Sequence, residues 1–235
     1  MVQEDIHIMT PQVIVYSCVT AGYDDLAGTL FKGAPIPEDN VKFVLFTDRS
    51  PSGDTGVWEV GPLKWHHATC PRRSARYHKC MSQRVLPSHD YSVWVDGSQI
   101  FKGVKVWEDI VKPQVISGYD VATFKHPLRQ CAYQEERACE RHRKDNVSVM
   151  RSQMDRYRAE GYPPYNGMVE TACVIRANTD PVHEFNAAWW DELTKDSFRD
   201  QLSFNYVCWR LGFQYGHIPG HREESCFFNF VSHKR

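Results

Sequence analysis

The sequence lacks any long apolar run and any marked excess of charge of one sign. Among its 235 residues, 28 Lys and Arg stand against 29 Asp and Glu, a formal net charge of −1. Without a global positive field, the chain has no general means of attracting nucleic acid or an anionic membrane. It also has no stretch of about 18 apolar residues, the length of a membrane-spanning helix. The composition therefore predicts a soluble globular protein with no nucleic-acid partner and no transmembrane segment.

Signal-peptide, disulfide and zinc patterns are also missing. Residues 1–7 have neither the basic start nor the apolar core of a signal peptide. The eight cysteines are scattered, without a C-x-x-C pair or zinc-like spacing. Cys131, Cys139 and His142 fit one stripe of a helix better than a metal site. We therefore predict reduced, mostly buried cysteines and a cytoplasmic location.

What the sequence does contain is an alternation of strand and helix patterns. Apolar β-branched or aromatic runs between turn residues predict strands, and longer segments without helix breakers predict helices. The expected strands cover residues 13–19, 41–47, 57–60, 91–95, 120–124 and 170–176. The expected helices cover residues 74–86, 131–143, 147–160, 180–193 and 198–211. This order predicts a single α/β domain over residues 1–235, with a mostly parallel sheet covered by helices on both faces.

The strand at residues 91–95 is the most informative, because it stops abruptly at Asp96, Gly97 and Ser98. Ligands of α/β proteins bind just outside the carboxyl ends of parallel strands. Asp96 is therefore expected to face a binding site at the edge of the sheet. Asp and Gly are also ordinary turn residues, so a plain turn stays open as the alternative.

Two earlier loops and a basic segment can serve the same site. Gly22 allows close approach of the backbone and Tyr23 offers a ring for a base, while Asp48 can hydrogen-bond a ribose. Residues 72–79 hold four cations, and three of them share one face at helical spacing. Arg and Lys suit the oxygens of a diphosphate. A solvated helix face is the alternative, and the position directly before the strand that ends at Asp96 favours the diphosphate.

Carboxylates and imidazoles towards the C-terminus supply further candidates. Glu170 opens a predicted strand and Asp200 lies near the start of a predicted helix. Each is either a catalytic acid or base, or a partner of a salt bridge or helix dipole. His217 and His221 share one predicted turn and are either metal ligands or exposed loop histidines.

Taken in order, these segments resemble a glycosyltransferase-like domain of unknown function found in bacteria, in some viruses, and in plant turgor-regulator and mucilage proteins. The matching segments are residues 19–24, 46–48, 76–79, 94–98, 126–129, 134–136, 153–163, 166–170, 189–190 and 199–204. They extend over almost the whole chain in family order. The resemblance implies a GT-A fold, with a nucleotide-sugar part at residues 12–125 and an acceptor part at residues 126–235.

The resemblance also implies metal-assisted transfer of a sugar from a nucleotide-diphosphate donor to a glycan or another hydroxyl acceptor. GT-A enzymes usually hold Mn²⁺ or Mg²⁺ with a D-x-D motif, and this chain has serine at the second position. The expected metal ligands are Asp96, Ser98 and His217 or His221. The expected donor-binding residues are Thr20, Gly22, Tyr23, Asp48, Arg73, Arg76, Lys79 and Gly97. If the reaction inverts configuration, Asp200, slightly ahead of Glu170, is the expected general base.

Two other classes of function stay open. One is a nucleotide-sugar or glycan-binding module that has lost catalysis, which the missing second aspartate suits. The other is a hydrolase, because plant members of the family have been discussed as ceramidases. The sequence contains neither a G-x-S-x-G elbow nor an H-E-x-x-H helix, which counts against the hydrolase.

Overall fold

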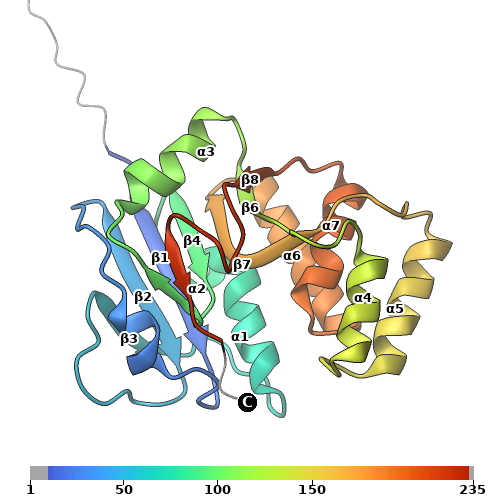
Figure 1. Cartoon of the computed structure of the whole chain (residues 1–235), viewed down its shortest axis with the longest axis horizontal. Coiled ribbons are helices and arrows are strands. Elements are labelled where there is room, and N and C mark those ends of the chain that lie inside the picture. Colours follow the sequence, from blue (N-terminus) through green and yellow to red (C-terminus); the bar gives the residue numbers. More distant parts are fainter. Residues whose placement is uncertain (1–9, 233–235) are drawn as a thin grey trace, which may run out of the picture.

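A seven-stranded sheet in the order β3-β2-β1-β4-β7-β6-β8 organises the protein (Figure 1). The computed structural model describes residues 10–232, so the segment on which the signal-peptide argument rests lies outside it. All neighbouring strands are parallel except that β7 runs antiparallel to both β4 and β6. The predicted mostly parallel α/β sheet is confirmed, and it is consistent with a GT-A-like fold.

The elements follow the predicted order with a few additions. The strands are β1 (Val13–Val19), β2 (Val41–Thr47), β3 (Trp58–Pro62), β4 (Tyr91–Val95), β5 (Gln99–Phe101), β6 (Val121–Lys125), β7 (Val169–Ala177), β8 (Gly216–Ile218) and β9 (Phe228–Phe230). The helices are α1 (Pro71–Cys80), α2 (Ser82–Val85), α3 (Lys112–Ile116), α4 (Ala132–Arg141), α5 (Val147–Ala159), α6 (Asp180–Lys195) and α7 (Asp200–Leu211). Short helical turns are η1 (Leu26–Gly28), η2 (Leu30–Lys32) and η3 (Val106–Val111).

The sheet has a hydrophobic core on each face. Successive side chains of a strand point to opposite faces, so Val15 and Tyr16 of β1 enter different cores. Tyr16 lies in the core formed with α1, α2 and α4 to α7. Val15 lies in the core formed with η3, β5 and β9. Both faces of the sheet are therefore covered, but the predicted long helices lie on one face only, and the other is covered by η3 and the β5–β9 strand pair.

The helix predicted at residues 74–86 is wrong in its bounds, because two helices meet at Met81. The first begins earlier, with Pro71 at its first position, where a missing N–H costs nothing. Ser74 does not cap it; its hydroxyl accepts a hydrogen bond from the backbone N–H of His67 at 2.9 Å. The carbonyls at its end are taken by Arg176 of β7, which stops the helix there.

The chain after β8 returns to form a second, two-stranded sheet with β5, the strand that follows β4 in the chain. Strand β9 pairs antiparallel with β5, and the N–H of Val231 donates to the carbonyl of Ser98 at 2.9 Å. The turn predicted to hold both histidines is wrong for His217, which lies in β8 and pairs with Thr123 of β6. The C-terminal segment thus contacts Ser98, two residues after Asp96.

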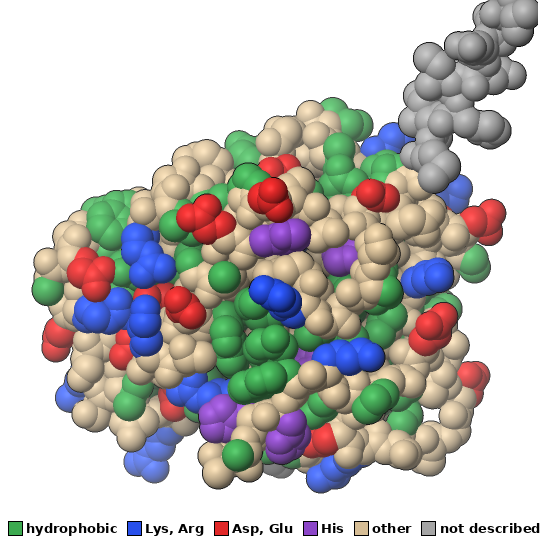
Figure 2. Space-filling model, turned by 180° about the vertical axis from the view of Figure 1, so that it is seen from behind, with side chains coloured by type: hydrophobic (Ala, Val, Ile, Leu, Met, Phe, Trp, Pro, Cys, Tyr) green, Lys and Arg blue, Asp and Glu red, His purple; other side chains and the backbone are tan. Residues whose placement is uncertain are grey.

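The surface and the cysteines agree with the composition. Acidic and basic side chains are interspersed over the face drawn in Figure 2, without a region of one sign. All eight cysteines are free, and six of them are buried, as predicted; Cys70 is half-buried and Cys226 is exposed. Within residues 10–232, no helix is both long enough and apolar enough to cross a membrane.

Candidate active site

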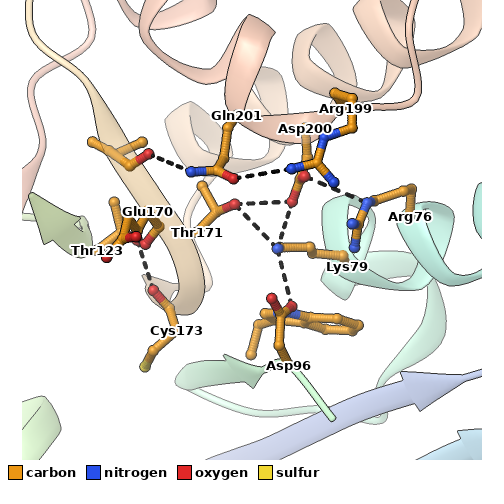
Figure 3. Close-up of polar contacts among 12 residues, drawn as sticks. Arg76, Lys79, Asp96, Thr123, Glu170, Thr171, Cys173, Arg199, Asp200 and Gln201 are labelled. Atoms are coloured by element: carbon orange, nitrogen blue, oxygen red, sulfur yellow. Dashed lines mark hydrogen bonds and ion pairs between the residues drawn. The ribbon is translucent and has the colours of Figure 1, made fainter. Parts of the chain in front are cut away.

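The centre of the candidate site is the ammonium group of Lys79, in the last turn of α1. Lys79 is completely buried. Its Nζ lies 3.2 Å from Asp96 Oδ1, 2.5 Å from Asp200 Oδ2 and 3.2 Å from Thr171 Oγ1 (Figure 3). These oxygens come from the end of β4, the start of α7 and β7. One cation therefore ties together three elements that are distant in sequence.

Asp96 is the member of this cluster that solvent can reach. Its side chain is one-third exposed. The indole N–H of Trp94 donates to Oδ1 at 2.7 Å, on the same oxygen that meets Lys79. Among the described residues, Oδ2 makes no hydrogen bond or ion pair. Asp96 is thus anchored through one oxygen and presents the other to the site.

Asp200 is buried and fully engaged. Arg76 Nε lies 3.5 Å from Oδ1, and the hydroxyl of Thr171 donates to Oδ2 at 2.9 Å. Burial alone raises the pKa of this carboxyl, but Arg76, Lys79 and the half-buried Arg199 outweigh it and hold the pKa well below its usual range. A carboxylate this acidic is a weak proton acceptor, so its placement favours a role in positioning Lys79 and Arg76.

The pKa of Glu170 is shifted in the opposite direction to that of Asp200. It precedes Thr171 on β7, so its side chain points to the other face of the strand. The backbone N–H of Arg222 donates to Oε2 at 3.2 Å, and the guanidinium Nε lies 3.4 Å from Oε1. Burial raises the pKa of Glu170 and outweighs the lowering by Arg222. Of the two predicted acid or base candidates, Glu170 therefore has the pKa better suited to accepting a proton near neutral pH.

The loops after β1 and β2 are joined at the same edge. Both carboxylate oxygens of Asp48 accept from the N–H of Ala21, at 3.0 and 2.9 Å. Ala21 and Gly22 both have positive φ, at 55° and 64°, which turns the loop sharply. The hydroxyl of Thr20 donates to the carbonyl of Pro71 at 2.9 Å and fixes the loop to α1. Thr20 and Asp48 thus stabilise the conformation of the predicted nucleotide-binding loop through hydrogen bonds to the backbone.

The predicted basic face divides into two parts. Arg76 and Lys79 turn towards Asp200, as described above. Arg73 does not join them, because its Nη2 donates to the carbonyl of Asp196 at 2.9 Å. Arg72 instead lies over the exposed ring of Tyr23, 5.8 Å from its centroid. The structure therefore brings two of the three predicted diphosphate contacts to the site.

Several site residues were missing from the sequence prediction. A Cβ added at Gly97 would clash with the carboxylate of Asp24, which packs directly against the glycine. A Cβ at Gly22 would likewise clash with the guanidinium of Arg49. Only glycine permits either approach. Arg49 and Asp24 both lie in segments directly after predicted strands, and this position was the feature of the sequence that pointed to them.

The predicted metal ligands do not converge on Asp96. Trp94 faces Val174, Val174 faces Thr123, and Thr123 faces His217 across successive strands. With a strand spacing of about 4.8 Å, His217 lies about 14 Å from the end of β4. One metal cannot bind ligands that far apart, so the predicted combination of His217 with Asp96 is not assembled.

The other predicted ligands give no metal cluster either. His221 lies in a turn, with Nε2 3.5 Å from Oε2 of Glu224. Ser98 is buried, and its backbone carbonyl accepts a hydrogen bond from the N–H of Val231 in the C-terminal segment. Residues 10–232 contain no group of three or more His, Cys, Asp or Glu side chains able to hold a metal ion. A divalent metal at Asp96 would also meet the ammonium of Lys79, so the side chains present do not fit one.

A mostly parallel α/β sheet with carboxylates, the buried Lys79 and the partly exposed Arg76 gathered at one edge is consistent with a GT-A-like fold. The model of the TOD1/MUCI70 glycosyltransferase-like domain matches residues 1–229, and the chain belongs to this family. This confirms the resemblance on which the sequence prediction rests.

Two plant relatives, both from Arabidopsis thaliana, carry different names. The chain is 28% identical over 225 residues to the "Probable hexosyltransferase MUCI70", an alignment that covers 83% of this chain and 37% of the relative. It is 28% identical over 141 residues to the "Alkaline ceramidase TOD1", covering 55% of this chain and 30% of the relative. The chain thus spans about a third of the length of these relatives.

Proposed function

We propose that this protein transfers a sugar from a nucleoside-diphosphate donor to a hydroxyl group of a glycan or similar acceptor. The observation that carries the proposal is the pair of cations, Lys79 and Arg76, held at the carboxyl edge beside Asp96. Donors bind at this edge in α/β folds, and a leaving diphosphate needs fixed positive charge. Membership of a glycosyltransferase-like family supports the same reaction class.

The proposed reaction divides the work among these residues. The bond between the anomeric carbon and the diphosphate oxygen breaks, and the nucleoside diphosphate leaves with the electron pair. Arg76 stabilises the charge that develops on the leaving oxygen, and the buried Lys79 adds to this through its fixed positive field without contacting the donor. The acceptor oxygen bonds to the anomeric carbon and gives its proton to a base. The loop at Gly22 and Tyr23, braced by Asp48, holds the nucleoside.

A pocket of about 540 Å³ between α4, the end of α5 and the segment that follows α5 is the proposed acceptor site. Its wall includes the segment of residues 161–165, which lies just before β7 in the chain. Tyrosine rings and prolines offer flat apolar faces on which sugar rings stack. The lining residues are Cys131, Tyr133, Gln134, Arg137, Arg158, Gly161, Tyr162, Pro163, Pro164 and Tyr165. An acceptor bound here would lie on the α4 and α5 side of the sheet, whereas the side chain of Glu170 points to the other face, so this pocket and a base at Glu170 are alternative arrangements.

The pH dependence of transfer distinguishes the two candidate bases. With Glu170 as base, kcat/KM falls as the pH drops through its raised pKa, above the value of about 4.3 of an ordinary glutamate. With Asp200 as base, no such loss occurs in the accessible range, because its pKa is far lower. We expect Glu170→Gln to lower kcat by about 10²–10⁴-fold and to remove the acid limb from initial-rate profiles.

Glu223→Gln is the matched control for this variant, because Glu223 also contacts Arg222 but is exposed. It should leave the profile unchanged. An acid limb that persists in Glu170→Gln at wild-type rate would assign the base elsewhere.

The experiment that tests the function is turnover with a panel of nucleotide-sugars, with and without Mn²⁺, in the presence of oligosaccharide acceptors. Release of nucleoside diphosphate together with a glycosylated product supports the proposal. Tight nucleotide binding without turnover of any donor would identify a binding module instead. Because one relative is named a ceramidase, ceramide is included as a substrate, and its hydrolysis without sugar transfer would refute the transferase.

A further inference from the structure

We propose that the ammonium of Lys79 permanently fills the oxygen cage that a divalent cation would need at this site, so that the protein works without a metal. The inference rests on the proposed sugar transfer for its consequence in catalysis. Its structural part, occupation of the cage by lysine, stands on the geometry alone and can be tested without any substrate.

The cage consists of three oxygens of the kind that hard cations prefer. Two are carboxylate oxygens, from Asp96 and Asp200, and the third is the hydroxyl of Thr171. Mg²⁺ and Mn²⁺ bind such oxygens, Mg²⁺ at about 2.0–2.1 Å. Here the three surround a nitrogen at 3.2, 2.5 and 3.2 Å, which are hydrogen-bond lengths. The ammonium thus takes the position of the ion.

Lys79 cannot easily withdraw from this cage. Its carbonyl accepts hydrogen bonds from Arg176 Nη2 at 2.7 Å and from the hydroxyl of Tyr16 at 3.0 Å, which fixes its backbone. Its Nζ also lies 5.4 Å from the ring centroid of Trp94. Burial leaves the side chain no route to solvent. An incoming divalent ion would face a fixed positive charge within a few ångströms, in a site that screens poorly.

Mn²⁺ alone is the probe for the test. We expect the wild-type protein to bind no stoichiometric Mn²⁺ by electron paramagnetic resonance, and its sugar transfer to change less than about twofold between EDTA and Mn²⁺. Lys79→Ala empties the cage and leaves the three oxygens in place. We expect this variant to lose transfer and to bind one equivalent of Mn²⁺.

Lys79→Met is the matched control, because it fills the same space without a charge or a lone-pair competitor. It should lose transfer and gain no Mn²⁺. Near-ultraviolet circular dichroism checks that both variants fold. A folded Lys79→Ala protein that binds no Mn²⁺ would contradict the cage.

The wild-type measurement decides the matter even if Lys79→Ala does not fold. One equivalent of Mn²⁺ bound by the wild type, and lost in Asp96→Asn, would overturn the inference. That result would leave the proposed transferase reaction intact. Conversely, absence of sugar transfer with every donor would refute the proposed function without touching the occupation of the cage, since Mn²⁺ binding is measured without donor or acceptor.

Discussion

Asp96→Asn is expected to lower the rate of sugar transfer by about 10²–10³-fold while leaving the fold intact. The amide keeps an oxygen for the indole N–H of Trp94, so the end of β4 stays in place. It removes one of the two negative charges that hold Lys79. The ammonium then shifts towards Asp200 and away from the diphosphate. The oxygen that Asp96 presents to the donor is also replaced by a hydrogen-bond donor.

Initial rates with the preferred donor, together with thermal unfolding, measure this effect. Asp191→Asn is a suitable control, because it makes the same chemical change on an exposed part of α6. The control should retain wild-type transfer. Wild-type activity in Asp96→Asn would return Asp96 to the role of an ordinary turn residue.

Arg176→Met is expected to lower the free energy of unfolding by about 3–5 kcal/mol. Arg176 is completely buried on β7 and has no carboxylate partner among the described residues. Its guanidinium donates to the carbonyls of Lys79 and Cys80, to Asn186 Oδ1 and to the hydroxyl of Tyr16. The two carbonyls are the negative end of the α1 dipole. Methionine fills the volume but leaves these acceptors without donors.

Urea unfolding of the wild type and variant measures this loss. Arg176→Lys keeps the charge and part of the hydrogen bonding, so its stability should lie between the two. Because Arg176 also fixes the backbone of Lys79, both variants should raise the donor KM. A loss below about 1 kcal/mol in the methionine variant would show that water can replace the guanidinium.

Local patterns in the sequence were sufficient for most of the fold. Apolar runs such as the one at residues 13–19 and segments without helix breakers such as the one at residues 147–160 predict elements that the structure contains. The short strands β5, β8 and β9 were missed, because three residues carry no periodicity. The antiparallel direction of β7 could not be predicted either, since strand pairing depends on contacts between residues distant in the chain.

In the site too, residues with a local sequence pattern could be predicted and long-range contacts could not. Asp96 and the basic helix were visible because each has a local signature. The contact between Lys79 and Asp200 joins residues far apart in the chain, and no spacing rule predicts it. The role of Arg176 was hidden for another reason. A buried arginine without an acidic partner has no sequence signature, because its acceptors are backbone carbonyls.

The distribution of cysteines has a practical consequence for spectroscopy. Burial raises the pKa of the Cys80 thiol to about 12 and that of Cys139 to about 11, so these groups resist maleimide reagents in the folded protein. Cys226 is exposed and lies between β8 and β9, where the carbonyls of its neighbours Ser225 and Phe227 accept hydrogen bonds from Lys102. A fluorophore attached there would report movement of this segment when a donor binds, without any engineered substitution.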